Sequence, residues 1–384
     1  MNIILNGQSL QYPLTGIGYY TRYLLEGLQE HEFINQLICI PDIHKSNQEI
    51  KKNFFFKTNL KKIIKSFPGT YSLLNNYRNI RFINKTRFLA HDNFIYHEPC
   101  YILRPYLGPK ICTIHDLSHI HYPRYHPKDR IQFLIHHLSE SVNNADHIIT
   151  GSDFNRNELI NFFKIPSYKI TSIYHGVSKI FRPRKFNEVI DFLTQFNLHD
   201  KTYLLSVGTL EPRKNLERLI QAFKRLPEQQ RNKYPLVLAG IKGWNTPRFG
   251  KLTRSLIKKE QLYCLGYVPE VYLPYLYSGA YGFIYISIYE GFGLPLLEAM
   301  ASGIPTLASS ESAMLEVVGD AAIITNPFDI DLITDKINQL ITDLALRHTL
   351  KKLGPIQAAK FSWDSCIENT IAVYRKTLIS LGIN

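Results

Sequence analysis

The chain has 384 residues, of which 45% are hydrophobic and 20% charged, a composition that is typical of globular domains and excludes a disordered protein. No apolar run reaches the roughly 18 to 20 residues that a membrane-spanning helix needs, and the opening MNIILNG does not look like a signal peptide. The five cysteines form no C-x-x-C pair, which argues against a disulfide framework or a zinc site and favours the reduced cytosol.

The net charge of +13 is concentrated in one segment. Residues 45–90 hold eleven Lys or Arg and a single acid, Glu49, with eight aromatic residues between them. Such a segment could lie on the anionic inner face of the cytoplasmic membrane. It could also bind nucleic acid, or form the solvated face of an ordinary helix pair. The sequence gives no recognised nucleic-acid motif and no indication of the oligomeric state.

Short apolar strands alternate with helices along the first half of the chain. We expect strands at residues 1–6, 37–40, 94–97, 110–114, 147–150 and 170–174. We expect helices at residues 18–30, 128–143 and 152–163, the last capped by Ser152. This alternation predicts a parallel sheet with helices on both faces.

The first glycine turn lies between the first strand and the first helix and reads Gly16-Ile17-Gly18-Tyr19-Tyr20-Thr21. It is close to a dinucleotide fingerprint, but Thr21 stands in place of the third glycine and no acidic residue ends the second strand. The match therefore indicates only a turn whose backbone could approach an anion.

A histidine-rich stretch follows the strand at residues 110–114. His115, next to Asp116 at the end of that strand, is a candidate to donate a hydrogen bond to an oxygen of a sugar or phosphate. A metal site is the weaker interpretation, because His119 and His121 are only two residues apart and no cysteine is nearby.

Residues 181–200 are charged and contain proline, so we interpret them as an interdomain connection. The alternation then restarts. Strands are expected at residues 203–207, 236–239, 261–265, 280–288, 306–308 and 322–325. Helices are expected at residues 215–226, 248–259, 273–278, 295–303, 331–344 and 363–380. Two doubly wound domains in tandem result, and such sheets bind ligands beyond the carboxyl ends of their strands, here in a cleft between the two.

Two adjacent cations, Arg213 and Lys214, follow the first strand of the second domain in a turn shaped by Gly208 and Pro212. Arginine binds a phosphate through a planar fork and lysine as a point charge, so the pair suits a diphosphate. Cations at a helix start oppose the helix dipole, which favours function over a solvated surface.

The stretch Glu290 to Glu298 reads E-G-F-G-L-P-L-L-E. It combines a buried strand, a glycine turn and a helix that begins at Pro295, with one carboxylate on each side of the turn. A helix N-terminus of this kind can hold an anion, although a plain helix start with surface glutamates is the alternative. The D-x-D of Asp329 and Asp331 is interpreted as a helix cap and not as a metal site.

Taken together, these motifs resemble the retaining glycosyltransferases of GT-B family four, and the matches run through nearly the whole chain in order. They are TGIGYY at 15–20, TIHDLS at 113–118, ADHIITGS at 145–152, GTLEPRKNL at 208–216, LGYVP at 265–269, YEGFGLPLLEAMASGIP at 289–305 and EVVGDAA at 316–322. The resemblance implies an α/β GT-B fold of two Rossmann-like domains facing across a cleft. The implied ranges are 1–180 for the acceptor side, 181–365 for the nucleotide-sugar side, and 366–384 for a helix that could pack back on the N-terminal domain.

The resemblance also assigns roles to individual residues. Arg213 and Lys214 would bind the donor diphosphate and stabilise it as it leaves, which makes a metal unnecessary. Gly16 and Gly18 would approach the diphosphate from the first domain, and His115 would lie near the transferred sugar.

The remaining roles concern the donor itself. Glu290 would hydrogen-bond the donor sugar, and Glu298 would bind the ribose hydroxyls. Tyr267 and Val268 would lie along the base. The backbone of the turn would support sugar and phosphate at Gly291, Phe292, Gly293 and Leu294.

The resemblance predicts an enzyme that transfers a hexose, best matched by mannose, from a nucleoside-diphosphate sugar, best matched by a GDP-sugar. The acceptor would be a glycan or lipid-linked glycan of lipopolysaccharide or exopolysaccharide assembly. A non-catalytic sugar-nucleotide-binding protein and a sugar-nucleotide epimerase on the same scaffold are the alternatives.

Overall fold

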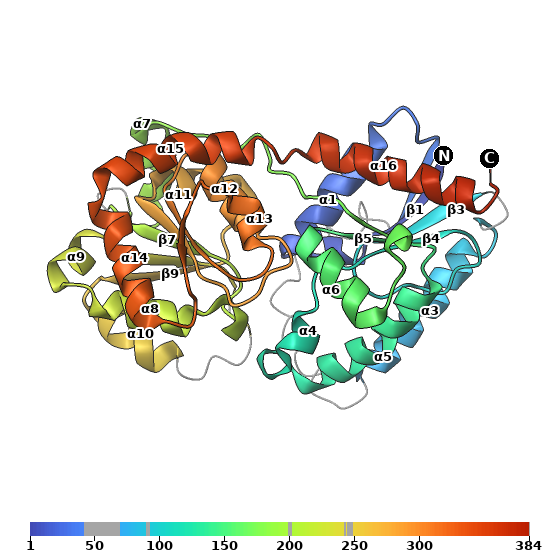
Figure 1. Ribbon diagram of the computed structural model, residues 1–384, viewed down its shortest axis with the longest axis horizontal. Coiled ribbons are helices and arrows are strands. Elements are labelled where there is room, and N and C mark those ends of the chain that lie inside the picture. The colour runs from blue at the N-terminus through green and yellow to red at the C-terminus, as the bar shows by residue number, and fades with distance from the viewer. Residues whose placement is uncertain (42–69, 90–92, 199–201, 242, 244–248, 384) are drawn as a thin grey trace. The chain divides into compact units, whose positions relative to one another are not determined.

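The computed structural model describes residues 1–41, 70–89, 93–198, 202–241, 243 and 249–383. These residues form two compact units (Figure 1). Unit 1 consists of Met1–His175 and Trp363–Asn384, and unit 2 of Gly176–Ser362. The larger part of the basic segment, residues 45–69, lies outside the described residues, as does residue 90.

Unit 1 contains a six-stranded parallel sheet in the order β2-β1-β3-β4-β5-β6. Its strands are β1 (Asn2–Asn6), β2 (Gln36–Ile40), β3 (Phe94–Glu98), β4 (Lys110–Thr113), β5 (His147–Thr150) and β6 (Ile170–Ser172). Successive side chains of a strand point to opposite faces, so Ile148 and Ile149 enter different cores. Both are buried, which explains why these strands are nearly continuous apolar runs.

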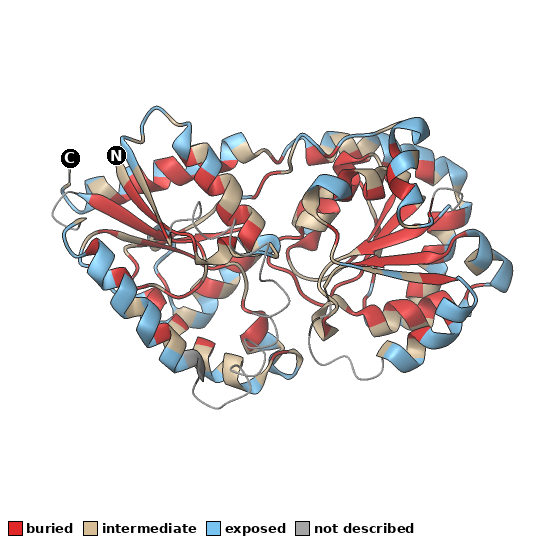
Figure 2. Cartoon of the chain, turned by 180° about the vertical axis from the view of Figure 1, so that it is seen from behind, coloured by how far each residue is buried: buried red, intermediate tan, exposed pale blue. Residues whose placement is uncertain are grey.

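Helices cover both faces of this sheet (Figures 1 and 2). They are α1 (Gly16–Gln29), α3 (Thr70–Thr86), α4 (Ser118–His121), α5 (Lys128–Asn144), α6 (Asp153–Phe163) and α16 (Trp363–Ser380). The Ser152 side chain accepts from the backbone N–H of Asn155 at 3.2 Å, so the expected cap of α6 is confirmed. On one face, Ile367 and Tyr374 of α16 join the core that α1 makes with the sheet.

Unit 2 repeats this plan with the order β12-β11-β10-β7-β8-β9, again all parallel. Its strands are β7 (Leu204–Val207), β8 (Leu236–Ala239), β9 (Leu262–Gly266), β10 (Gly282–Tyr285), β11 (Thr306–Ser309) and β12 (Ile323–Thr325). Its helices are α7 (Phe186–Thr194), α8 (Leu216–Arg225), α9 (Glu228–Lys233), α10 (Phe249–Lys258), α11 (Leu273–Gly279), α12 (Leu294–Ala301), α13 (Met314–Val318), α14 (Ile330–Thr342) and α15 (Leu344–Ala358). Figure 2 shows the buried strands at the centre of each unit.

Each sheet has one point where the strand order reverses. In unit 1, β2 lies on one side of β1 and β3 on the other. In unit 2, β8 lies on one side of β7 and β10 on the other. Loops that leave the carboxyl ends of such neighbouring strands diverge, and ligands of doubly wound sheets bind there.

Three expectations about elements need correction or completion. Residues 181–200 are not a plain connection, because they contain α7, whose Val189, Phe192 and Leu193 are buried in the core of unit 2. Helix α15 was not expected, and β10 is shorter than the apolar run that predicted it. Asp329 caps α14 by accepting from the Leu332 N–H at 3.0 Å, as predicted.

Within the described residues, no helix is long and apolar enough to cross a membrane.

Candidate active site

The turn after β7 carries the two predicted cations in a fixed geometry. A short 3-10 helix, Pro212–Lys214, ends at Asn215, which adopts the left-handed conformation with φ of 60°. The Asn215 side chain donates to the carbonyls of Ile286 at 3.1 Å and Pro327 at 2.6 Å. The Arg213 carbonyl accepts from the Ile288 N–H at 2.9 Å. The bonds with Ile286 and Ile288 attach the turn after β7 to the loop after β10, where the strand order reverses, and the bond to Pro327 attaches it to the segment after β12.

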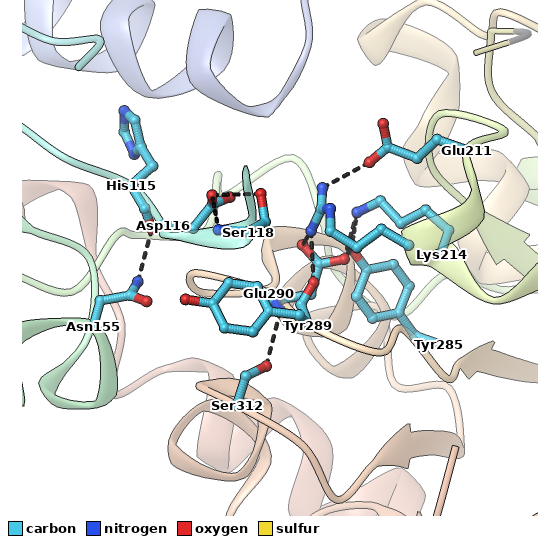
Figure 3. A network of polar contacts seen from close by, with 11 residues as sticks. His115, Asp116, Ser118, Asn155, Glu211, Lys214, Tyr285, Tyr289, Glu290 and Ser312 are labelled. Atoms are coloured by element: carbon cyan, nitrogen blue, oxygen red, sulfur yellow. Dashed lines mark hydrogen bonds and ion pairs between the residues drawn. The ribbon is translucent and has the colours of Figure 1, made fainter. Parts of the chain in front are cut away.

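Glu290 is the centre of the polar network drawn in Figure 3. Its carboxylate accepts from Arg213 Nη1 at 2.8 Å, from Lys214 Nζ at 2.6 Å and from the Tyr285 hydroxyl at 2.9 Å. Its backbone N–H donates to Ser312 Oγ at 2.8 Å. Only 6% of Glu290 is exposed, so these contacts replace water around the charge.

The charges of this network determine the protonation of Glu290. Burial raises the pKa of a carboxyl group, but the charges of Arg213 and Lys214 outweigh that effect and lower the pKa of Glu290 to about 2. Glu290 is therefore ionised throughout the physiological range. It can accept hydrogen bonds there but cannot act as a general acid.

Glu211 is a second buried carboxylate that holds the cations, and we assigned it no role from the sequence. It is 5% exposed and accepts from Arg213 Nη2 at 2.7 Å. Arg213 also donates to the Tyr289 carbonyl at 2.6 Å, and Lys214 donates to the Tyr285 hydroxyl at 2.6 Å. The only sequence signal for Glu211 is its place two residues before Arg213. Tyr285 lies in an apolar strand, so nothing in the sequence distinguishes it from a core residue.

The glycine turn after β10 leads into α12. Gly293 has φ of +110°, a conformation that favours glycine, and it caps the helix. The first helical residue is Leu294, so Pro295 occupies the second position and not the first. Phe292 is buried against the ring of Phe361, which leaves only its backbone to meet a ligand.

Glu298 lies in the second turn of α12, in surroundings that differ from those of Glu290. It accepts from the Tyr277 hydroxyl at 2.8 Å, and burial raises its pKa to about 8. A mostly protonated carboxyl group at neutral pH can donate one hydrogen bond and accept others. Such a group suits neutral ribose hydroxyls better than phosphate. After β9, Val268 is buried in the core of unit 2, whereas Tyr267 is partly exposed.

In unit 1, His115 lies at the carboxyl end of β4. Its Nε2 lies 2.8 Å from the Pro99 carbonyl oxygen, which can only accept, so Nε2 carries the proton. Burial lowers the pKa of His115 and keeps the ring neutral. Nδ1 of the neutral ring is then an acceptor, which corrects the expectation that His115 donates to a ligand oxygen.

The neighbours of His115 are equally well defined. Its backbone carbonyl accepts from Asn155 Nδ2 at 2.7 Å, and the Tyr20 ring of α1 packs edge-on against it, with 5.0 Å between ring centroids. The next residue, Asp116, accepts with its Oδ1 from the backbone N–H of Ser118 at 3.0 Å and from the Ser118 hydroxyl at 2.7 Å.

The two glycines of the first turn differ in their surroundings. Gly16 is exposed at the start of α1, and a Cβ there would meet nothing within 4 Å. Gly18 is buried, and a Cβ there would lie 2.9 Å from the Ser9 carbonyl oxygen. Gly18 thus serves packing, and Gly16 is the glycine with space for a ligand.

A metal site at the histidine-rich stretch finds no support in the geometry. Among the described residues, the His/Cys/Asp/Glu group with ligand atoms close enough to share an ion is His136, His137 and Glu140, on the surface of α5. His119 and His126 are both buried, and His121 Nε2 lies 3.0 Å from Glu158 Oε1.

Comparison with known families gives a match on each half of the chain. Residues 14–179 match the family described as Glycosyltransferase Family 4, and residues 191–356 match Glycosyl transferases group 1. Each match falls within one of the two predicted domains.

Curated relatives are similar over long stretches. O-antigen chain mannosyltransferase B of Escherichia coli is 36% identical over 379 residues, which cover 98% of this chain and 100% of the relative. The serotype-specific mannosyltransferase WbdA of Escherichia coli is 32% identical over 277 residues, 70% of this chain but 34% of that protein. Among solved structures, sucrose-phosphate synthase from Thermosynechococcus elongatus shares the fold with a TM-score of 0.73 at 20% identity, covering 99% of this chain and 100% of that one.

Proposed function

The chain belongs to glycosyltransferase family 4, has the GT-B fold and is a glycosyltransferase, and on that premise we propose that it is a retaining mannosyltransferase of O-antigen assembly that uses GDP-mannose. The observation that carries the chemistry is the ion-paired group of Arg213, Lys214 and the buried Glu290 after β7 and β10. The choice of mannose follows from the full-length relative, and the choice of GDP from the common activation of that sugar.

The transfer reaction demands stabilisation of a leaving group. Breaking the bond between sugar and phosphate leaves extra negative charge on the diphosphate, while the sugar gains oxocarbenium character. Arg213 and Lys214 would stabilise that charge, and they are held beforehand by Glu211, Glu290 and the Tyr289 carbonyl. Donors fixed in advance need little reorganisation during the reaction, which is the main source of such catalysis.

The other site residues would orient the donor. Glu290, always ionised, would accept hydrogen bonds from sugar hydroxyls, and Glu298 would bind the ribose. His115 Nδ1 would accept from a hydroxyl of the transferred sugar. We propose that the leaving diphosphate takes the proton of the acceptor hydroxyl, and that Arg213 and Lys214 make a divalent metal unnecessary.

We propose further that the acceptor is lipid-linked and that α3 holds the enzyme at an anionic membrane. The outer side of α3 carries large apolar and basic side chains among its polar residues. Leu73, Tyr77 and Ile80 follow one stripe of the helix and are 71%, 58% and 59% exposed. The residues that α3 buries include the polar Asn75 and Thr86.

The charge of this surface matches a membrane of anionic lipids. Residues 70–89 contain four basic residues and no acid, and Arg81, Lys85 and Arg87 are exposed. A helix that turns its apolar stripe outward and surrounds it with cations fits the boundary between headgroups and acyl chains.

Transfer assays on single variants test the proposed activity. With GDP-mannose and a lipid-linked O-antigen acceptor, Lys214→Ala and Glu290→Gln should each lower kcat by about 10²–10³-fold, the usual loss when one group that stabilises transition-state charge is removed. Lys259→Ala, which removes a surface ion pair of 2.7 Å with Glu228, is the matched control and should leave kcat unchanged.

Three outcomes would oppose the proposal. Wild-type protein that binds GDP-mannose but transfers nothing would indicate a binding protein. Conversion of the donor into another sugar nucleotide without acceptor would indicate an epimerase. Loss of transfer after chelation of divalent metals, with recovery on their return, would contradict the metal-free mechanism.

A further inference from the structure

Unit 1 has its own buried carboxylate where its strand order reverses. Asn6 is the last residue of β1 and Glu98 the last residue of β3, and the two strands are direct neighbours in the sheet. They are 4% and 3% exposed. This position corresponds to that of the Lys214–Glu290 pair in unit 2, which lies beyond β7 and β10. Neither residue has a role in the proposed chemistry.

The side chains of Asn6 and Glu98 bind each other and the residues that follow their strands. Asn6 Nδ2 donates to Glu98 Oε2 at 2.5 Å, and the Tyr96 hydroxyl donates to the same oxygen at 2.6 Å. Glu98 Oε1 accepts from the Cys100 N–H at 3.1 Å. Asn6 Oδ1 accepts from the Gln8 N–H at 3.0 Å, and this bond fixes which way the Asn6 amide points.

On the side of Glu98, this bonding fixes the turn that holds His115. The Cys100 N–H bound by Glu98 belongs to the same peptide group as the Pro99 carbonyl, and that carbonyl accepts a hydrogen bond from His115 Nε2–H at 2.8 Å. Glu98 thereby determines where that carbonyl points. The carbonyl in turn keeps the proton on Nε2 and leaves Nδ1 as an acceptor.

On the side of Asn6, the bonding reaches the glycine turn at the start of α1. Gln8 opens the short 3-10 helix Gln8–Leu10. Ser9, the next residue, donates from its hydroxyl to Thr21 Oγ1 at 2.7 Å. Its carbonyl lies where a Cβ on Gly18 would clash. The segment that Asn6 holds is therefore the one against which α1 packs.

We propose that Asn6 and Glu98 form a positioning pair that aligns both parts of the unit 1 site, the His115 ring and the glycine turn of α1, for transfer. Neither residue touches the reacting atoms. The pair acts by linking the loops that leave β1 and β3, the loops that diverge where the strand order reverses. This inference rests on the proposed function, because it deepens the role given to His115.

The bonding pattern suggests a rescue experiment. In Glu98→Gln, an amide NH₂ replaces one carboxylate oxygen. If the NH₂ group faces Asn6 Nδ2, two hydrogen-bond donors point at each other. If it faces Cys100, it points at the Cys100 N–H, which is also a donor. In the double variant Asn6→Asp/Glu98→Gln, the new aspartate can accept from both the Gln8 N–H and the new glutamine. The glutamine oxygen can still accept from the Cys100 N–H. The Tyr96 hydroxyl, which donates to this side of Glu98 in the wild type, can rotate to accept from the new NH₂ group, so the exchange restores the link.

Three measurements test the role of Asn6 and Glu98: kcat, the affinity for GDP and the NMR shifts of His115. Glu98→Gln should lower kcat by about tenfold to a hundredfold, since displacement of a catalytic group by one ångström costs about 10²-fold. The affinity for free GDP should change less than kcat, because Arg213, Lys214 and Glu298 of unit 2 supply most of the proposed nucleotide contacts and unit 1 contributes only the glycine turn. The nitrogen NMR shifts of His115, assigned with His115→Asn, should lose the pattern of a ring protonated only on Nε2. The double variant should recover kcat to within about threefold and regain that pattern.

A matched control separates positioning from stability. Tyr374→Phe removes a buried 2.6 Å hydrogen bond to His97 on the same strand β3 and should lower the melting temperature with kcat nearly unchanged. Unaltered His115 shifts in folded Glu98→Gln protein, or absence of rescue in a folded double variant, would overturn the inference. If Glu98→Gln fails to fold, Asn6→Ala takes its place in the kcat and NMR measurements, and unchanged values there overturn it equally. The NMR readout needs no substrate, so it tests the pair even if the donor is not GDP-mannose.

Discussion

Gly16 and Gly18 are two residues apart in one turn, yet the structure gives them different tasks. Gly18→Ala should lower the melting temperature by several degrees, because its Cβ would lie 2.9 Å from the Ser9 carbonyl, a backbone atom that cannot move freely. Gly16→Ala should fold normally, since nothing lies within 4 Å of the added Cβ. If the diphosphate occupies that space, Gly16→Ala raises the KM for the donor about tenfold or more.

Differential scanning fluorimetry and donor kinetics on Gly16→Ala and Gly18→Ala test these two expectations. Each variant serves as the control for the other, because the chemical change is identical. Unchanged donor KM in Gly16→Ala would mean that the first glycine turn does not approach the diphosphate.

At the same scale, sequence patterns identify charged residues better than their partners. Arg213, Lys214 and Glu290 stand in motifs with unusual spacing, and the structure brings them into direct contact. Glu211 could not be distinguished from a surface acid, because its burial depends on the fold of the turn. Glu290 and Glu298 look alike in the sequence, but only Glu290 has cations beside it, so their pKa values move in opposite directions.

Among the elements, α3 carries the most direct test of membrane contact. A triple variant Arg81→Gln/Lys85→Gln/Arg87→Gln should weaken binding to vesicles containing phosphatidylglycerol by at least about tenfold, because each basic residue near an anionic surface contributes about 1 kcal/mol. Leu73→Gln/Tyr77→Gln/Ile80→Gln should do the same by removing the apolar contact. Vesicle sedimentation measures both, with pure phosphatidylcholine as the uncharged comparison.

The control for α3 is Val271→Gln/Ile356→Gln, which changes two exposed apolar residues of unit 2 that are 64% and 63% exposed. This variant should bind vesicles like wild type. If the α3 variants bound anionic vesicles as well as wild type does, the membrane role would be refuted. A change of oligomeric state in the α3 variants would show that a second copy of the chain covers this surface.

Element prediction succeeded where one physical signal dominated. The strands of both sheets in the described residues lie within or beside apolar runs, since parallel strands are buried on both faces. Helix α7 was not predicted, because Pro183 and the cations beside it are typical of a linker, although Val189, Phe192 and Leu193 have helical spacing. Helix α15 was missed because Gly354-Pro355 resembles a helix end. In the folded chain Gly354 packs on the Met300 backbone, and the helix continues past Pro355 to Ala358.

For the whole molecule, the histidines predict an order of acid unfolding. Twelve of the fourteen histidines belong to unit 1. Burial lowers the pKa of His97 to about 3 and of His119 and His147 to about 4, and it also lowers the pKa of His115 and His175. In the unfolded chain these histidines have their ordinary pKa near 6.5 and bind protons below it, whereas the folded chain does not. Unit 1 therefore loses stability as the pH falls below about 6.5.

Two carboxyl groups modify this order. Glu98, whose pKa burial raises to about 7, binds a proton in the folded state between about pH 4.5 and 7, so it opposes the loss, but as one group against five. Glu290, with a pKa near 2, contributes stability to unit 2 that disappears only as the pH falls from about 4.5 towards 2. Unit 1 should therefore unfold at higher pH than unit 2.

Trp363 makes the order measurable, because its ring stacks on Tyr23 of α1 at 4.6 Å. In a Trp244→Phe background, its fluorescence should change at higher pH than the final loss of far-UV circular dichroism. His147→Gln should shift the fluorescence midpoint to lower pH. A single coincident transition for both signals would contradict the predicted order.

Helix α16 gives the molecule one further property, which concerns its synthesis. Unit 1 is split in the chain, and all of Gly176–Ser362 is translated before Ile367, Ile371 and Tyr374 can fill the core beside α1. Domains fold as units while they leave the ribosome, so the half that is made first is completed last. Until α16 arrives, the side of α1 with Tyr23, which stacks on Trp363, and Gly27, which lies against Ile367, lacks its cover. A chaperone that follows this nascent chain would find its binding surface there, and would lose it when α16 docks.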